Sequence, residues 1–292
     1  MKFFSYLLFL AVPLLFLSIF TFYPVVASVF YSFYDSKTGD FGIGNYVRVL
    51  SDTNPLRALV MPRFGDTPPW GALIHNVVWI AIHVPLVTLL GLLLAYVLKY
   101  YVVGSNIVKG IVFLGMVIPP AIGGLIIRLM YDGDIGIVPK FFSALGVKEL
   151  AVTWINYPNL ALYALILGSV WIWLGFSVTI FTAALEAIPK SHIDAARVFG
   201  ASSWQIFRRI VIPEVRAAIV IVVVMTMLWD MKIFDVVFAS TGGGPGGATN
   251  VLALVVYNYF ARSLDYYTAS TVAVILTILV VPAVVFAVKK WL

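Results

Sequence analysis

Long apolar stretches separated by short polar segments run along most of this chain. Five stretches lack Asp, Glu, Lys and Arg for longer than the roughly 20 residues that a membrane-spanning helix needs. They are Phe3–Tyr34, Thr67–Leu98, Leu150–Leu185, Val236–Ala261 and Tyr266–Val288. The fourth contains a run of glycines and a proline at 242–247, which opposes a continuous helix. The other four stretches therefore predict membrane-spanning helices.

Two further stretches have softer edges. Ile107–Met130 includes a lysine and an arginine near its ends, and Ala217–Ala239 holds three charges. With them, the pattern predicts an all-α polytopic membrane protein with six transmembrane helices, forming one domain over residues 1–292. Phe3–Tyr34 exceeds the core of a signal peptide and has no clear cleavage site, so we expect it to be a retained first helix.

Composition supports a membrane protein and gives it an orientation. The 292 residues are 62% hydrophobic and 11% charged, whereas about a quarter of a soluble domain is charged. Lysine and arginine are more frequent in the segments that are cytoplasmic if both termini lie inside. We therefore attribute the net charge of +6 to residues that orient a multi-pass cell-membrane protein in the lipid bilayer, and not to a nucleic-acid-binding surface. The absence of cysteine excludes disulfides and thiolate metal sites, and we predict no metal site.

A charged segment, residues 190–214, separates the predicted fourth and fifth helices. It carries Asp194, Arg197, Arg208 and Arg209. A membrane interior rarely holds so many charges, so this segment is expected in water at one membrane face. The alternative is an amphipathic helix lying on the lipid headgroups.

The local sequence of this segment predicts two short helices joined by a turn. Ser191 with Asp194, and Ser202 with Gln205, have the spacing of a capping box. Gly200 lies between them, where a residue with positive φ commonly ends a helix. We name residues 190–214 the elbow.

The elbow resembles the cytoplasmic signature of permease subunits of bacterial and archaeal ABC importers. That signature reads Glu-Ala-Ala, three residues, Gly, nine residues, then Ile-x-Leu-Pro. The matching groups here are Asp194-Ala195-Ala196, Gly200 and Ile210-Val211-Ile212-Pro213, with Asp for Glu and Ile for Leu. The resemblance implies a coupling loop that seats in a cleft of an ATPase subunit. The coupling residues that it implies are Asp194, Ala195, Ala196, Gly200, Arg208 and Pro213.

Two other segments resemble sugar-class members of the same family. Residues 234–257 look like the Phe-Asp…Thr-Gly-Gly-Pro…Tyr run of sugar permeases, and residues 41–50 look like their Phe-x-Gly-x-x-Asn-Tyr segment. The resemblance implies a maltose-type carbohydrate importer. Its implied partners are a second permease subunit in a heterodimer, two ATP-binding cassette subunits and an extracytoplasmic sugar-binding protein. The chain lacks a phosphate-binding Gly-x-x-x-x-Gly-Lys-Ser/Thr loop, so we expect a transport subunit that is not an enzyme, with ATP and Mg²⁺ on the partner subunits.

Helix breakers and aromatic residues suggest where a substrate passes. Pro119 and Pro120 interrupt the predicted third helix near Met116. Broken helices in transporters often mark the substrate site, although a simple packing kink is the alternative. Trp171 and Gly175 share one face of the fourth helix, as a sugar-stacking shelf or as ordinary packing.

The predicted fifth helix is the most polar. Thr226 and Asp230 share a face, and Trp229 offers an apolar surface to a sugar ring. We assign Lys232 and Asp235 to a structural ion pair and Asp230 to the substrate path, where a carboxylate accepts sugar hydroxyls. The candidates for the path are Met116, Pro120, Trp171, Gly175, Thr226, Trp229 and Asp230.

Other interpretations remain open. The second predicted helix carries His75 and His83, which either relay protons or, as we favour, bond to a neighbouring helix. The elbow fits equally a permease of the same superfamily for glycerol phosphate, polyamines or amino acids. An ion-coupled secondary transporter with Asp230 as its relay is the alternative from another class, but it needs no elbow and often shows inverted repeats.

Overall fold

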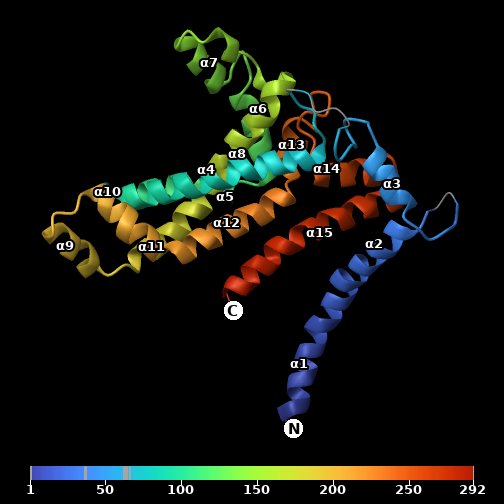
Figure 1. The fold of residues 1–292 in the computed structure, drawn as a ribbon, viewed down its shortest axis with the longest axis horizontal. Coiled ribbons are helices and arrows are strands. Elements are labelled where there is room, and N and C mark those ends of the chain that lie inside the picture. The colour runs from blue at the N-terminus through green and yellow to red at the C-terminus, as the bar shows by residue number, and fades with distance from the viewer. Residues whose placement is uncertain (1, 36–37, 62–64, 66, 292) are drawn as a thin grey trace.

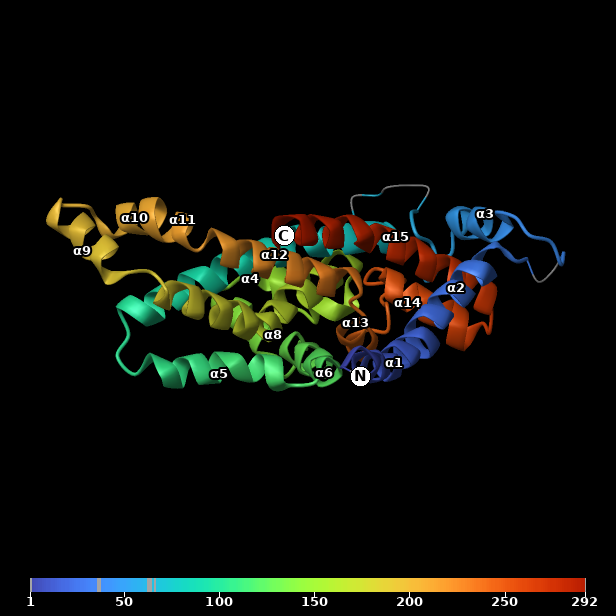
Figure 2. The same ribbon diagram turned by 90° about the horizontal axis from the view of Figure 1, so that it is seen from below.

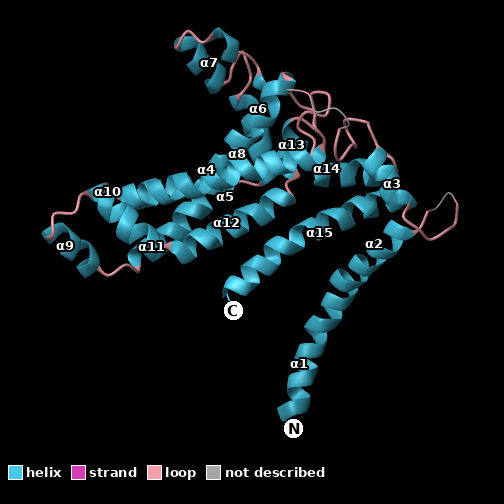
Figure 3. Ribbon diagram, in the orientation of Figure 1, coloured by secondary structure: helices cyan, strands magenta, loops and turns pink. Residues whose placement is uncertain are grey.

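The computed structural model describes residues 2–35, 38–61, 65 and 67–291, and it contains no β-strand among them (Figure 3). The predicted all-α class is confirmed. Figure 1 labels the α-helices. Their bounds are α1 Lys2–Leu17, α2 Tyr23–Phe33, α3 Gly44–Ser51, α4 Ala72–Tyr100, α5 Ser105–Val117, α6 Pro120–Met130, α7 Ile137–Ala144, α8 Pro158–Glu186, α9 Lys190–Val198, α10 Ser203–Ile206, α11 Ile212–Glu214, α12 Arg216–Met231, α13 Asp235–Ser240, α14 Leu252–Tyr257 and α15 Tyr266–Trp291.

Three helices are long and apolar enough to cross a membrane, and the count rises to five if each of two bent pairs is one span. The three are Phe9–Phe33, which runs through a π-helical turn, Ala72–Tyr100 and Pro158–Glu186. The bent pairs are α5 with α6, at 104°, and Ser203–Glu214 with α12, at 69°. The remaining expected span corresponds to α15, whose apolar part Tyr266–Pro282 is shorter. Six spans therefore stay a prediction.

Close backbone contacts hold the central helices together. α4 packs along α8, where a Cβ on Gly91 would overlap the Ser177 hydroxyl. α5 packs on the other side of α8, where a Cβ on Gly175 would lie 2.9 Å from the Cα of Phe113. Small residues allow such approach between membrane helices, and close packing is their main source of attraction there. Gly175 therefore has a packing role in this structure.

The predicted break in the third helix is confirmed. α5 ends at Val117 and α6 begins at Pro120, because a proline supplies no backbone N–H to continue the ladder. After the break α6 runs beside α13 (Figure 1), and a Cβ on Gly124 would lie 2.6 Å from the carbonyl oxygen of Val236.

The predicted fifth helix is also interrupted, which corrects two expectations. α12 ends at Met231 and α13 begins at Asp235. Lys232 therefore lies in the non-helical connection between the two helices, and it does not share a helix with Asp235. The two side chains are exposed and form no ion pair with each other. The proposed structural pair is therefore wrong, because the chain turns between its two members.

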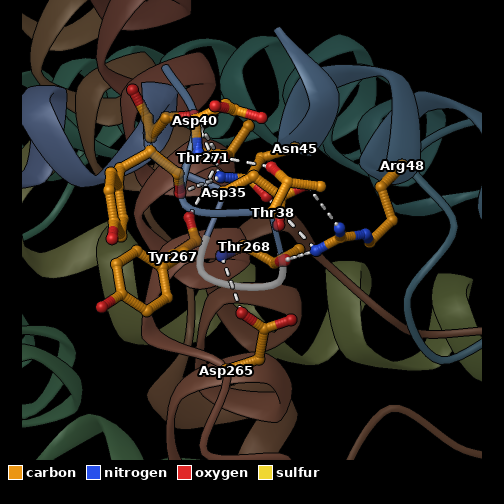
Figure 4. A network of polar contacts seen from close by, with 11 residues as sticks. Asp35, Thr38, Asp40, Asn45, Arg48, Asp265, Tyr267, Thr268 and Thr271 are labelled. Carbon is orange, nitrogen blue, oxygen red and sulfur yellow. Dashed lines mark hydrogen bonds and ion pairs between the residues drawn. The ribbon is translucent and has the colours of Figure 1, made fainter. Parts of the chain in front are cut away.

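The first and last long helices meet only near one end. α2 packs against α15 and α3, whereas α1 diverges from the other helices (Figures 1 and 2). A polar network ties this meeting point together (Figure 4). Arg48 of α3 pairs with Asp35 at 3.0 Å and donates to Asn45 and Thr268, and buried Asn45 donates to the Tyr34 carbonyl at 2.8 Å. The elbow lies at the opposite end of the molecule in both views.

Candidate functional site

The elbow contains the predicted turn between two short helices. α9 ends in a Schellman motif, in which Gly200 N–H donates to the Arg197 carbonyl and Ala201 N–H donates to the Ala196 carbonyl, each at 2.9 Å. Gly200 has φ of +78°, the left-handed conformation that glycine adopts at little cost. The turn therefore depends on the residue type at this position.

One of the two predicted capping boxes forms. Ser202 accepts from Gln205 N–H at 3.3 Å, and the Gln205 side chain accepts from Ser202 N–H at 2.8 Å. The box predicted at Ser191 and Asp194 is wrong, because α9 begins at Lys190, after Pro189, and has no side-chain cap. Asp194 instead lies 3.8 Å from Arg197, an exposed pair of little energetic weight.

Apolar side chains anchor the elbow to the ends of the long helices. Ile193 and Ile206 are buried in one cluster with Leu98 of α4 and Leu185 of α8. The aromatic ring of Phe207 packs edge-on to Tyr96 of α4, with 4.8 Å between the ring centroids. The elbow therefore packs directly on the ends of α4 and α8.

The outer side of the elbow is apolar and exposed. Phe199 is 89% exposed, Val198 84% and Trp204 65%. Ala195 is exposed as well, whereas Ala196 packs partly against the buried cluster. None of these three large side chains is among the coupling residues that the family resemblance implies; their position close to Gly200 was the available signal.

A polar groove of about 670 Å³ lies between α9 and the base of α12. His192 Nδ1 lies 3.2 Å from Glu214 Oε1 across it, and both side chains are about half exposed. Arg209, Pro213 and Arg216 line the groove, and Arg208 is exposed nearby. Pro213 lies in α11, directly before the bend into α12.

In the bundle interior, Asp230 of α12 faces α4. Its Oδ2 lies 2.9 Å from Nδ1 of His83, and both side chains are completely buried. The interpretation of His83 as bonded to a neighbouring helix is confirmed, and Asp230 has a partner that the sequence analysis did not assign. Thr226, one turn before Asp230, is buried and its hydroxyl has no partner.

The other histidine of α4, His75, is hydrogen-bonded to the loop that follows α13. His75 Nδ1 donates to the Asn250 carbonyl at 2.7 Å, because its Nε2 already accepts from the Trp70 backbone N–H at 3.0 Å. The glycine-rich segment ending at Asn250 is packed, and a Cβ on Gly247 would lie 2.5 Å from the Pro55 carbonyl oxygen. Gly247 therefore allows close backbone approach between this segment and the chain around Pro55.

The turn after α14 also bonds to the chain near Pro55. The Tyr259 hydroxyl donates to Asp52 Oδ2 at 2.6 Å, and Asn258 donates to the Leu56 carbonyl at 2.9 Å. Burial, with the hydrogen bond to Asp52, raises the pKa of Tyr259. The phenol therefore stays protonated and keeps donating well above neutral pH.

The aromatic candidates form a stack between α8 and α12. The indoles of Trp173 and Trp229 are nearly parallel, 20° apart, with 4.3 Å between centroids. Phe176 meets Trp229 edge-on at 4.8 Å, and all three side chains are partly exposed. Trp173 was missed as a candidate because its partner comes from another helix, whereas the predicted Trp171 does not enter the stack.

The other path candidates surround the break in the third span. Met116 is exposed near the end of α5, and Pro120 is half-buried at the start of α6. The carbonyl of Trp171 lies against Gly115, where an added Cβ would approach it to 2.7 Å. The structure thus brings Trp229 together with Trp173, and turns Asp230 toward His83 on another side of α12.

Comparisons with known proteins give a consistent result. The family model for "Binding-protein-dependent transport system inner membrane component" matches residues 87–292. A "Probable ABC transporter permease protein" of Pyrococcus horikoshii is 48% identical over 274 residues, covering 93% of this chain and 92% of the relative.

Two further matches, one to a protein sequence and one to a solved structure, cover nearly the whole chain. The alpha-glucoside transport system permease protein of Rhizobium meliloti is 30% identical, over 97% of this chain and 81% of the relative. A chain of a bacterial ABC transporter involved in the import of the acidic polysaccharide alginate matches with a TM-score of 0.80 and 18% identity, covering 99% of this chain and 95% of that one. At that identity the structural match shows the fold alone.

Proposed function

Because this chain belongs to the binding-protein-dependent transport system inner membrane component family, the permease components of ABC importers, we propose that it forms the translocation path for a sugar or oligosaccharide. It would work with a second permease subunit, two ATP-binding cassette subunits and an extracytoplasmic sugar-binding protein. The chain is membrane-embedded, and we propose that both termini lie in the cytoplasm.

The observation that carries the sugar proposal is the Trp173–Trp229 stack. Sugar rings present apolar C–H faces, and flat indoles bury such faces while leaving the hydroxyls free to bond elsewhere. The stack joins α8 to the last turn of α12, immediately before the break at residues 232–234. Interrupted helices expose backbone groups that can bond a polar substrate, so an aromatic platform and a polar backbone lie together.

Substitution of the platform tests this proposal. Trp229→Leu and Trp173→Leu, in the chain assembled with its partners, should each raise the KM for a transported sugar about two- to tenfold, since stacking on an aromatic residue contributes on the order of 0.5–1.5 kcal/mol. Phe20→Leu, which removes a 69% exposed ring from the first helix, is the matched control and should leave KM unchanged. Uptake of a panel of labelled sugars, polyamines and amino acids identifies the substrate class, and transport confined to a non-sugar solute would refute the proposal.

We further propose that the apolar tip of the elbow, Val198, Phe199 and Trp204, seats in the ATPase subunits. Exposed apolar groups of this size are costly in water and provide anchors when a partner buries them. ATP would then drive transport because the nucleotide binds two conformations of the assembly with different affinity.

The elbow proposal has its own test. Phe199→Asp should abolish copurification of the ATPase subunits, because docking would bury an unpaired charge. Ile43→Asp changes an exposed apolar residue, 66% exposed, at the opposite end of the molecule and is the control. Equal recovery of the ATPase with Phe199→Asp and with the unchanged chain would contradict this docking surface.

A further inference from the structure

A buried polar contact joins α4 to α12 at Asp230, the residue that follows Trp229 of the tryptophan stack. His83 and Asp230 are completely buried and lie 2.9 Å apart, Nδ1 to Oδ2. We propose that His83 is a positioning residue for transport: it sets the rotation of α12 about its own axis and thereby holds Trp229 against Trp173. This inference rests on the proposed function of the Trp173–Trp229 platform.

The geometry of a helix makes the two contacts interdependent. Trp229 and Asp230 are consecutive, so their side chains leave α12 about 100° apart. With Asp230 held toward α4, the indole of Trp229 is directed toward α8, where it stacks on Trp173 and meets Phe176. If α12 turned about its axis, the hydrogen bond and the stack would be lost together.

A second residue of α4, Asn76, fixes the position of α12 along its own axis. Asn76 donates to the carbonyls of Asp230 and Met231 at 3.1 and 3.3 Å, and its own carbonyl accepts from Leu252 N–H at 2.9 Å. These are terminal carbonyls of α12, which have no partner within the helix. Asn76 and His83 are seven residues apart, close to two full turns, so one face of α4 makes both ties.

The remaining contacts of α12 do not determine its rotation. The other buried side chains are Ala218, Val222, Val224 and Thr226, and the Thr226 hydroxyl has no hydrogen-bond partner. Aliphatic contact is non-directional, so one such residue can take the place of another as the helix turns. A hydrogen bond between a carboxylate and an imidazole has a required direction, so the bond from His83 to Asp230 constrains the rotation of α12 in a way that aliphatic contacts do not.

The chain offers a clean reporter of this rotation because it contains no cysteine. In Thr226→Cys, the single thiol replaces a completely buried hydroxyl that makes no hydrogen bond, so no bond is lost. Alkylation by a membrane-permeant maleimide should be slow in this variant. Adding His83→Leu should increase the alkylation rate about tenfold or more, because α12 no longer holds residue 226 in the core.

A second variant, His83→Asn, distinguishes a positioning role of His83 from a simple loss of packing. His83→Asn places an amide N–H where the imidazole Nδ1–H donates, so it should restore slow alkylation. In sugar uptake without the reporter cysteine, His83→Leu should raise KM about tenfold with little change in kcat, and His83→Asn should bring KM back toward the original value. If His83→Leu does not fold, His83→Gln takes its place, since its amide lies beyond the Nδ1 position, and it should also alkylate rapidly.

The outcomes are separable. Slow alkylation in both the Leu and Asn variants, or fast alkylation in both, would overturn the positioning role. If the unchanged chain transports no sugar, the proposed substrate class fails, while the alkylation rates still decide whether His83 orients α12.

Discussion

Gly200 gives the sharpest prediction for the elbow, because its substitution perturbs the backbone alone. Its φ of +78° lies in the left-handed region, and nothing lies within 4 Å of the position that a Cβ would take. A valine at this position therefore meets no clash, and its whole cost is the strain of a β-branched residue in that conformation. The left-handed helical conformation costs an L-residue roughly 1–2 kcal/mol.

That cost sets the size of the effect. A free energy of one to two kcal/mol lowers the ratio of native to non-native turn by a factor of about 5–30. Gly200→Val should therefore reduce sugar-stimulated ATP hydrolysis of the assembled transporter, by at most a similar factor. Membrane insertion and the melting temperature of the bundle should change little, since Gly200 is exposed and nothing lies within 4 Å of its Cβ position.

The assay compares three chains. Gly200→Asn should retain most of the coupling, because asparagine tolerates the left-handed region better than other residues. Gly42→Val serves as the control for added bulk, since Gly42 also has open space around it but no positive φ. Full coupling in Gly200→Val, or the same loss in Gly42→Val, would refute the role of the turn.

Three further predictions follow from other parts of the chain. A membrane-impermeant thiol reagent should label Gly42→Cys from outside the cell and leave Ser203→Cys unlabelled; the reverse pattern would overturn the orientation. Gly124→Val should destabilise the contact of α6 with α13 by roughly 1–3 kcal/mol, because its Cβ would lie 2.6 Å from a backbone oxygen. Gly110→Val, at a position with open space around it, is the control and should cost less. Equal melting temperatures of the two variants would contradict this prediction. Tyr259→Phe should cost about 1.5–3 kcal/mol through loss of a bond to a carboxylate, seen as a lower melting temperature. The pKa of Tyr259 is raised in the folded protein, so the stability that its hydrogen bond contributes should be fully present below about pH 10, the ordinary tyrosine pKa. That stability should decline as the pH rises through the pKa of the folded state. Loss of the contribution near neutral pH would contradict this prediction.

Much of the architecture could be predicted from the order of residues alone, because those features depend on local interactions. Long uncharged runs became the apolar helices, and two adjacent prolines ended α5 where their missing N–H groups require it. Gly200 and the Ser202–Gln205 box shaped the elbow through contacts within five residues. The family signature indicated the class of transporter for the same reason, since its residues are close in sequence.

Where local rules competed, the sequence was a weaker guide. Ser191 and Asp194 have the spacing of a capping box, but the N-cap of α9 is Pro189, two residues before Ser191, and the box does not form. Lys232 and Asp235 have helical spacing, but the chain leaves the helix between them. Spacing predicts a contact only where the helix is continuous.

The partners of the polar and aromatic side chains were decided by the tertiary structure. His83 and Asp230 are 147 positions apart, and Trp173 and Trp229 come from different helices. Such pairs depend on the rotation of each helix about its axis, which follows from how α4, α8 and α12 pack together. An apolar run that is hydrophobic on every side does not specify that rotation, because in a membrane each of its faces can meet lipid or protein at a similar cost.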